Sequence, residues 1–323
     1  MSKTLIDAGA HGLAVAYIDE AVELRDAGIT SPVILLFGCE HRYARDIFEF
    51  GLTPVVWSVG QAQSLSQEAV RLGKSINVHV KVDTGMGRVG ISPEMAVRTV
   101  SEISSMPGVV VEGLMSHFSD ADLADPDSSR EQLASFNRVS AEIAGSLRVR
   151  FRHLANSAAV VNLPETHLDM VRPGLMLYGY NPAPLVSGIE LEPAMTVTAR
   201  IVALKRVQPG TGIGYGRTFR TKRESLIATI AIGYADGFRR HLSNSGSVLY
   251  DGQRAPVVGR VCMDLTMIDM TGIGGASVGD AVTVIGSSGG GSIWADEMAG
   301  LAGTIPYEIL TCFGRRVKRV YDS

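Results

Sequence analysis

The segment Val78–Gly90 combines residues that could carry chemistry with glycines that could bring the backbone close to a ligand. His79, Lys81 and Asp83 alternate with three valines, so a strand here would turn its ionisable side chains to one face. Ionisable groups are rarely buried unless they are paired. Arg88 follows the glycines and offers a planar fork suited to a carboxylate or phosphate. The segment predicts a functional strand end, against the alternative of a salt-bridged strand followed by a glycine turn.

Polar residues also follow three further apolar runs, at His117, Ser157 and Arg172. In parallel α/β barrels such loops often form a phosphate site from backbone N–H groups, a helix N-terminus and a hydroxyl. Ser157 could cap the helix that follows it, or turn its hydroxyl and N–H to a phosphate. Gly174 permits close backbone approach, and Arg172 could balance a carboxylate or lie against a heteroaromatic nitrogen. Together these residues favour a phosphate site.

Three residues in the second half of the chain could act on a substrate, although each has an ordinary structural explanation. Tyr234 lies in a GYADG turn, and as an acid or base it would need a pKa lowered well below ~10 by nearby cations. Met263 follows an apolar run, where a core position is the ordinary expectation. Tyr307 lies in an IPYEI stretch, where a buried tyrosine with one hydrogen bond is the alternative.

The composition is that of a globular protein with a sizeable core. The chain has 323 residues, of which 46% are hydrophobic and 20% charged, and its net charge is −3 without a basic block. No apolar run reaches membrane-spanning length, and the first residues lack the apolar core of a signal peptide. The scattered cysteines, Cys39, Cys262 and Cys312, are typical of a reducing compartment and show no metal-ligand spacing. We expect a cytoplasmic protein with no metal, membrane or nucleic-acid partner.

Strand and helix patterns alternate along the first half of the chain, which predicts parallel strands joined by crossover helices. The expected strands cover 12–16, 33–37, 53–58, 78–83, 109–117, 150–155 and 169–176. The expected helices cover 2–8, 19–27, 40–50, 60–72, 93–104, 129–147 and 158–163. A doubly wound open sheet also fits, but polar residues at the carboxyl end of strand after strand favour an α/β protein with a (β/α)8-type barrel. Seven strands are one short of closure, so we expect the first strand to lie before Met1.

The pattern changes after Tyr180. Three prolines in 181–193 indicate a linker, and β-rich runs separated by glycine-rich turns follow it. Those runs cover 196–207, 225–232, 247–250, 255–261, 266–270 and 281–285, and a short helix is expected near 294–302. We therefore predict a barrel domain over 1–185 and a mainly β domain over 186–323.

Seven motifs, in this order along the chain, resemble those of the alanine racemases, a family that uses pyridoxal 5′-phosphate. The motifs are KVDTGMGRVG, EGLMSHF, HLANSAA, MVRPGLMLYG, IGYADG, GRVCMD and TIPYEI. The resemblance implies an N-terminal barrel, a C-terminal β domain and a homodimer. It implies an active site that combines the barrel mouth of one subunit with the β domain of the other. It also implies interconversion of L- and D-alanine by two bases, which supplies D-alanine for peptidoglycan.

The resemblance assigns roles in catalysis and substrate binding to four residues. Tyr234 resembles the tyrosine of the partner subunit that removes the α-proton of the L-enantiomer. Arg88 resembles the arginine near the phenolic oxygen of the cofactor and the substrate carboxylate, and Lys81 the often carbamylated lysine that holds this arginine. Met263 matches the residue whose backbone N–H meets the substrate carboxylate.

The remaining matched residues resemble those that hold the cofactor. Arg172 resembles the arginine at the pyridine nitrogen, and His117 the histidine that supports it. An arginine there keeps the ring nitrogen unprotonated, because arginine stays charged with a pKa above ~12. The phosphate cradle corresponds to the Ser157 hydroxyl, the amides of Gly174 and Leu175, and Tyr307.

One part of the family pattern has no counterpart in this sequence. The Schiff-base lysine of the family ends the first barrel strand, which would precede Met1, and no other lysine replaces it convincingly. Either the reading frame starts at an internal methionine, which we favour, or the chain is a truncated homologue that binds a ligand or partner without catalysis. We expect the chain as written to be inactive or nearly so. An in-frame lysine strand encoded upstream would favour the enzyme, and amino-acid profiling would separate alanine from serine or broad specificity.

Overall fold

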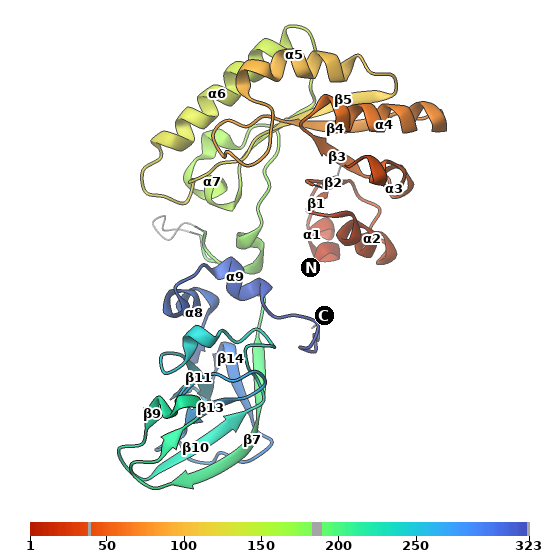
Figure 1. Cartoon of the computed structure of the whole chain (residues 1–323). Helices are drawn as coiled ribbons and strands as arrows, with labels where there is room; N and C mark the ends of the chain where they lie inside the picture. The colour runs from red at the N-terminus through yellow and green to blue at the C-terminus, as the bar shows by residue number, and fades with distance from the viewer. Residues whose placement is uncertain (38–39, 183–188, 322–323) are drawn as a thin grey trace. The chain divides into compact units, whose positions relative to one another are not determined.

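The computed structural model describes residues 1–37, 40–182 and 189–321 of the chain (Figure 1). The chain divides into two compact units, Met1–Gly174 with Asn181–Ile189 and Leu175–Tyr180 with Glu190–Ser323. The predicted domain boundary between 185 and 186, residues 183–188 of the predicted linker, and Cys39 lie outside the described residues. Each unit is described by itself below.

The first unit is built on a curled sheet of parallel strands, in which each strand pairs with its predecessor in the sequence (Figure 1). Its strands are β1 (Leu13–Val15), β2 (Val33–Leu35), β3 (Thr53–Val56), β4 (Ile76–Lys81), β5 (Val109–Met115) and β6 (Phe151–His153). This order brings the carboxyl ends of β4, β5 and β6 to one edge of the sheet. The predicted α/β class is thereby confirmed.

Helices precede, connect and follow these strands, and several of their ends follow local sequence signals. They are α1 (Ser2–Asp7), α2 (Ile18–Asp26), η1 (His41–Tyr43), α3 (Ala44–Glu49), α4 (Val59–Leu72), α5 (Pro93–Ser104), α6 (Asp127–Ala144), α7 (Ser157–Asn162) and η2 (Pro164–Thr166). The Ser58 hydroxyl accepts from the Gln61 N–H at the start of α4. Gly73 ends α4 in the left-handed conformation that glycine tolerates. The predicted helix over 93–104 matches α5 to the residue because Pro93 begins it.

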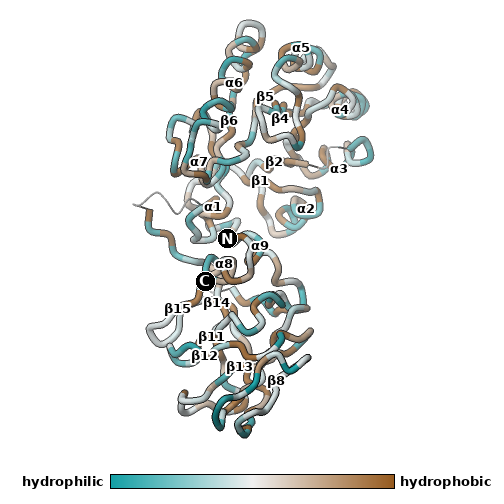
Figure 2. The backbone as a smooth tube through the Cα atoms, turned by 60° about the vertical axis from the view of Figure 1, so that its left-hand side comes forward, coloured by the Kyte–Doolittle hydropathy of each residue, from teal (hydrophilic) through white to brown (hydrophobic). Residues whose placement is uncertain are grey.

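Both faces of β4 are buried from Val78 to Lys81. Val78, Val80 and Val82 have no exposed surface and belong to the hydrophobic core of the unit. Figure 2 colours the backbone by the hydropathy of each residue, with β4 labelled. His79 is 1% exposed and Lys81 is 3% exposed on the other face. Two ionisable side chains are therefore held inside the curled sheet, where each needs a polar partner or a changed charge state.

The predicted strand over 169–176 is wrong. The segment runs beside β6 with two backbone hydrogen bonds, from Asp169 N to Arg152 O at 3.2 Å and from Arg172 N to Ala155 O at 3.0 Å. A parallel ladder would bond every second residue, whereas these bonds are three residues apart. Pro173 has no N–H to continue the pairing. The chain then forms the short helix η3 (Leu175–Tyr178) in place of a strand.

The second unit is mainly β, as predicted. Its larger sheet is antiparallel, with the order β12-β11-β14-β7-β10-β13 and with β15 paired to β14. The strands are β7 (Val197–Val207), β10 (Ser225–Ile230), β11 (Ser247–Tyr250), β12 (Gln253–Pro256), β13 (Thr266–Asp269), β14 (Ala281–Ser288) and β15 (Gly291–Ile293). The other elements are β8 (Gly212–Ile213), η4 (Tyr215–Arg217), β9 (Phe219–Arg220), η5 (Arg240–Leu242), α8 (Ala295–Ala302) and α9 (Pro306–Thr311). This unit has its own hydrophobic core.

Candidate active site

Lys81 and Arg88 lie close together at the carboxyl end of β4. The Lys81 ammonium and the Arg88 guanidinium each lie 5.8 Å from the centre of the Phe37 ring, where a cation–π attraction is effective. Burial, the positive charges of Arg88 and Arg172, and the opposing charge of Asp83 set the pKa of Lys81, which falls to about 8. A lysine with this pKa is partly neutral near physiological pH, so its amine can act as a nucleophile.

The loop after β4 is ordered by its own carboxylate. Asp83 Oδ1 accepts hydrogen bonds from the backbone N–H groups of Gly85 at 3.0 Å and Gly87 at 3.1 Å. The Gly90 Cα approaches the backbone of Asp83 so closely that an added Cβ would lie 2.6 Å from Asp83 N. The glycine turn of the alternative interpretation is therefore present, and it places the exposed Arg88 at the edge of the sheet.

Arg172 is the centre of the polar interior of the first unit. Its Nη1 lies 2.6 Å from His153 Nδ1, and its Nη2 lies 3.3 Å from His117 Nδ1. Nη2 also donates to the carbonyl oxygens of Ser116 at 2.8 Å and Leu154 at 3.4 Å. Burial lowers the pKa of Arg172 to about 10, so the guanidinium stays charged at neutral pH. Both imidazoles therefore present Nδ1 as an acceptor to a guanidinium that can only donate.

Burial and three surrounding cations keep His117 neutral. Desolvation, followed by the charges of Arg172, Lys81 and Arg88, lowers the pKa of His117 to about 3. The sequence predicted that His117 would support Arg172, and the structure places the two side chains in contact. A neutral acceptor at this position stabilises the guanidinium without adding a second positive charge beside it.

His79 and His153 form a buried pair that sequence reasoning did not place in the site. His79 Nδ1 lies 2.8 Å from His153 Nε2, and the ring centres are 4.9 Å apart. The sequence placed His79 with Lys81 and Asp83 on one face of the expected strand and His153 in the HLANSAA motif, but it assigned neither histidine a role. The useful signal was the position of each histidine on an inward face of the sheet, but His79 lies on β4 and His153 on β6, so the contact across β5 depends on the register of all three strands.

Ser157 and Gly174 meet at the carboxyl end of β6. The Gly174 N–H donates to Ser157 Oγ at 2.7 Å. Ser157 is not the helix cap considered in the sequence analysis, because the Asn156 side chain accepts from Ala159 N and caps α7. An added Cβ on Gly174 would meet nothing within 4 Å, so the space beside this amide is open. Leu175, the next residue, is buried and begins η3.

Tyr234 and Met263 lie side by side in the second unit. Tyr234 N donates to Cys262 O, and Ala235 N donates to Met263 O, both at 3.0 Å. Gly233 is required at this crossing, because an added Cβ would lie 2.3 Å from Met263 O. Tyr234 is 43% exposed and Met263 is 52% exposed, so neither is the core residue that its apolar neighbours alone would indicate.

Helix α9 carries Tyr307, and hydrogen bonds join the α9 segment to the loop that carries Tyr234. Arg239 Nη2 donates to Glu308 O at 3.2 Å, and Cys312 Sγ donates to Gly237 O at 2.9 Å. Tyr307 is 47% exposed, which excludes the buried tyrosine of the alternative interpretation. Within the second unit, the fold thus connects the segments that carry Tyr234, Met263 and Tyr307.

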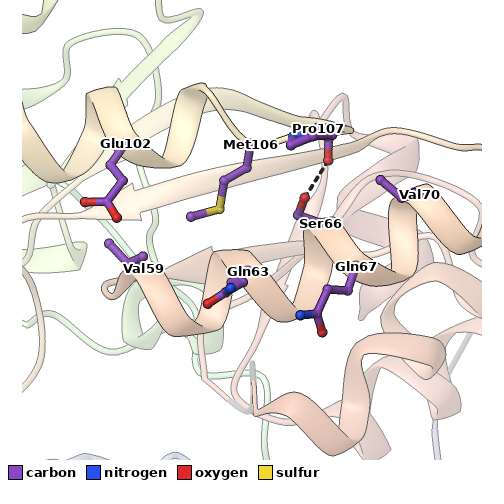
Figure 3. A pocket seen from close by; sticks show the side chains of 8 residues that line it. All are labelled: Val59, Gln63, Ser66, Gln67, Val70, Glu102, Met106 and Pro107. Carbon is purple, nitrogen blue, oxygen red and sulfur yellow. Dashed lines mark hydrogen bonds between the residues drawn. The ribbon is translucent and has the colours of Figure 1, made fainter.

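A pocket on the first unit lies away from these residues. Figure 3 shows it between α4 and the segment that follows α5, where Ser66 Oγ donates to Pro107 O at 2.7 Å. Of the described residues that line it, Glu102 alone is charged, and none belongs to the predicted site. The pocket therefore lacks the cations that a phosphate or carboxylate ligand would need.

Two kinds of feature are absent from the described residues. Over residues 1–37, 40–182 and 189–321, no group of three His, Cys, Asp or Glu side chains is arranged to hold a metal ion. No helix within those ranges has the length and apolar character needed to cross a membrane. The described residues thus offer a cationic and imidazole-rich site in the first unit and a tyrosine-bearing loop in the second.

Comparison with known proteins agrees with the sequence motifs. The model of the alanine racemase N-terminal domain matches residues 1–182, and the model of the C-terminal domain matches 194–321. An alanine racemase of Desulfovibrio desulfuricans is 45% identical over 315 residues, which are 97% of this chain and 84% of that protein.

Solved structures of alanine racemases are also similar to this chain. An alanine racemase structure from Clostridium difficile 630 aligns with a TM-score of 0.94 and 36% identity, covering 99% of this chain and 84% of that one. An alanine racemase from Bartonella henselae, with covalently bound pyridoxal phosphate, aligns with a TM-score of 0.88 and 30% identity, covering 98% of this chain and 87% of that one. The chain described here belongs to the alanine racemase family, a family of isomerases.

Proposed function

We propose that the protein racemises alanine with pyridoxal 5′-phosphate, in a homodimer whose active site combines the first unit of one copy with Tyr234 of the other. The observation that carries the proposal is the group of three cationic side chains, Lys81, Arg88 and Arg172, at one end of the parallel sheet. Membership of the alanine racemase family supports the reaction. D-alanine made in the cytoplasm for peptidoglycan is the corresponding proposed role.

The residues present fit an anionic, phosphorylated pyridine ring. The open space beside Gly174, next to the Ser157 hydroxyl, can admit a phosphate-sized group, and the neighbouring amides of Gly174 and Leu175 could face it. The Arg172 guanidinium donates to neutral acceptors and remains charged, which suits an unprotonated ring nitrogen. Tyr307 would complete the phosphate cradle, as the family resemblance implies.

When bound, pyridoxal 5′-phosphate would supply the electron sink that stabilises negative charge at the α-carbon of alanine. Tyr234 would then take the α-proton of L-alanine at its phenolic oxygen, or return it there in the reverse direction. The Met263 N–H and the Arg88 guanidinium would bind the substrate carboxylate and orient the Cα–H bond. Arg172 would hold the ring nitrogen unprotonated. This weakens the ring as an electron sink and favours return of the proton to the α-carbon.

We also propose that Lys81 is carbamylated. Its pKa of about 8 leaves a substantial neutral fraction, and a neutral amine can form an N–C bond to carbon dioxide with release of one proton. The carbamate would replace a cation by an anion beside Arg88 and so hold that guanidinium in place. The shared Phe37 ring already brings the two side chains to the same location.

The direct test measures D-alanine formed from L-alanine by the protein translated from the complete open reading frame that contains this sequence. With bound pyridoxal 5′-phosphate it is expected to racemise alanine. Tyr234→Phe, which removes only the hydroxyl, should lower kcat by about 10²- to 10⁴-fold and leave cofactor affinity unchanged. Racemisation that is absent from the parent, or unaffected by Tyr234→Phe, would contradict the proposal.

A further inference from the structure

A line of buried polar side chains extends from Arg172 across three strands of the parallel sheet. His153 Nδ1 lies 2.6 Å from Arg172 Nη1, and His153 Nε2 lies 2.8 Å from His79 Nδ1. At the far end, His79 Nε2 lies 3.8 Å from Glu112 Oε2. His153 has no exposed surface and His79 is 1% exposed, so both rings are shielded from bulk solvent.

The donors and acceptors that each side chain offers fix the direction of the hydrogen bonds along this line. A guanidinium has N–H groups and no acceptor, so His153 Nδ1 must accept from Arg172. A neutral imidazole then carries its proton on Nε2, which donates to His79 Nδ1. By the same reasoning His79 carries its proton on Nε2, the atom that faces the Glu112 carboxylate. All donors therefore point away from Arg172 and toward the one carboxylate.

Both imidazoles are neutral in this arrangement. Burial, and then the charge of Arg172, lowers the pKa of His79 to about 4. Burial, followed by the Arg172 charge and the neighbouring His79, holds the pKa of His153 well below its ordinary value. A single tautomer of each ring consequently persists across the physiological pH range.

The fold contains two local features that accommodate the His79 ring. The register between β4 and β5 shifts after Val78, so that Val78 pairs with Val111 and His79 pairs with Gly113. Glu112 lies at this irregularity, without a ladder partner of its own. A Cβ on Gly113 would lie 2.6 Å from His79 Cγ, so any larger residue would displace the ring.

Glu112 supplies the only carboxylate along the described part of this line. Its side chain is 17% exposed, and its Oε1 lies 3.3 Å from Arg150 Nη1 at the rim of the sheet. The side-chain hydrogen bonds described above for Arg172 go to two imidazole nitrogens and two carbonyl oxygens, all of them neutral. Hydrogen bonds link Arg172 to His153 and His153 to His79. The Glu112 carboxylate, 3.8 Å from His79 Nε2, acts on this chain through its charge and so stabilises the partly buried guanidinium.

We propose that His79 and Glu112 are positioning residues for Arg172. Together they fix His153 in the tautomer that accepts from Arg172 Nη1. This hydrogen bond holds one edge of the guanidinium and restricts its rotation. This role rests on the proposed function only where the oriented guanidinium supports an unprotonated cofactor ring nitrogen. The tautomers and the orientation of Arg172 concern the protein alone.

The first experiment needs no activity. The complete protein, free of cofactor and labelled with ¹⁵N in its histidine rings, should show the imidazoles of His79, His153 and His117 with unprotonated Nδ1 and protonated Nε2 from about pH 6 to pH 8. Glu112→Gln should weaken the fixed tautomer of His79, and His79→Leu should allow His153 to exchange between tautomers. Protonated Nδ1 on both His79 and His153, or a charge on both of these rings in the parent, would overturn the proposal.

The second experiment uses the protein loaded with pyridoxal 5′-phosphate. Glu112→Gln and His79→Leu should each change the pH dependence of the cofactor absorption spectrum and lower kcat for alanine by about 10- to 100-fold, with little change in KM. Glu112→Gln is nearly isosteric at a partly exposed site, so it keeps the test available if His79→Leu does not fold.

His167→Leu is the matched control. The His167 ring is half-buried, and its Nε2 lies 2.9 Å from the carbonyl oxygen of Val160, outside the line. This variant should leave the spectrum and kcat unchanged. If Glu112→Gln and His79→Leu altered only thermal stability, as a structural role would, the proposal would be wrong. If the parent failed to racemise alanine while the ring tautomers were as expected, the proposed function would fail and the tautomer assignment would stand.

Discussion

At the scale of single residues, the surroundings determine the charge state more than the residue type does. Lys81, His79 and His117 are ordinarily basic, yet burial and neighbouring cations lower the pKa of each, to about 8, 4 and 3. Arg172 stays charged because its pKa falls only to about 10. One permanent cation is thus surrounded by groups that can be neutral at pH 7, which is how a fold can separate acid and base roles.

The pKa of Lys81 makes carbamylation testable. About half of the amine is neutral at pH 8, compared with roughly one part in 300 for a lysine of ordinary pKa. Protein equilibrated with ¹³C-bicarbonate should show a carbamate carbon signal that is stronger at pH 8 than at pH 6.5. Lys81→Arg keeps the positive charge but cannot form the carbamate, so the signal should disappear. A signal that persists in Lys81→Arg would come from another amine and would contradict the assignment.

Gly113 is predicted to be intolerant of any side chain. The Cβ of Gly113→Ala would lie 2.6 Å from His79 Cγ, and we expect a loss of roughly 1–3 kcal/mol in the free energy of unfolding. Gly60→Ala in α4 is the control, because its Cβ would meet nothing within 4 Å and alanine favours a helix. Urea unfolding of both variants decides the matter, and equal stability would show that the His79 ring has room to move.

At the scale of elements, the sequence predicts those structures that depend on local signals. Pro93 and the apolar spacing after it predict α5 to the residue, and the prediction for α8 differs from the structure by a single residue. The strand over 169–176 was wrong because Pro173 interrupts a pairing that the apolar residues alone would favour. The contact between His79 and His153 was not predicted, since it depends on strand register and on the irregularity at Glu112.

The cap of α7 is predicted to affect ligand binding as well as stability. Asn156→Ala removes the side chain that accepts from Ala159 N at 3.0 Å, which should cost about 1 kcal/mol of stability. Because Ser157 begins this helix, affinity for pyridoxal 5′-phosphate should also fall.

Ser58→Ala provides the comparison for the α7 cap. It removes an equivalent cap at the start of α4, where the Ser58 hydroxyl accepts from Gln61 N at 3.3 Å. It should lower stability by a similar amount without changing cofactor affinity in a titration calorimeter. If both variants lowered affinity equally, the effect would be a general loss of stability and not a local one at Ser157.

At the scale of the whole molecule, each unit has a separate core, and each contains one tryptophan. Trp57 packs against the core of the first unit, and Trp294 packs against that of the second. In a Trp294→Phe variant, fluorescence therefore reports unfolding of the first unit, which contains all the perturbed imidazoles. This separation allows the stability of the polar interior to be measured without assuming that the two units unfold together.

The first unit is predicted to lose stability in mild acid. His79, His117 and His153 have pKa values lowered below 6.5, so the unfolded chain binds protons that the folded unit does not. Stability is therefore retained above about pH 6.5 and falls as the pH drops toward 4, by about 1.4 kcal/mol per pH unit for each such imidazole. His117→Asn should reduce this slope by one proton in urea unfolding followed through Trp57. A slope unchanged by the substitution would show that His117 is charged in the folded unit.

The central claim is that Tyr234 of one copy serves the cofactor site in the first unit of another. Complementation between two inactive variants tests it most directly. Tyr234→Phe removes the proposed base, and Arg88→Ala removes an exposed group from the other unit with little risk to the fold. Each variant alone should be nearly inactive. After mixing, unfolding and refolding in equal amounts, half of the dimers should contain one intact site, so about a quarter of the parent racemase activity should return. No recovery, despite exchange of subunits shown by mass spectrometry, would contradict the shared site.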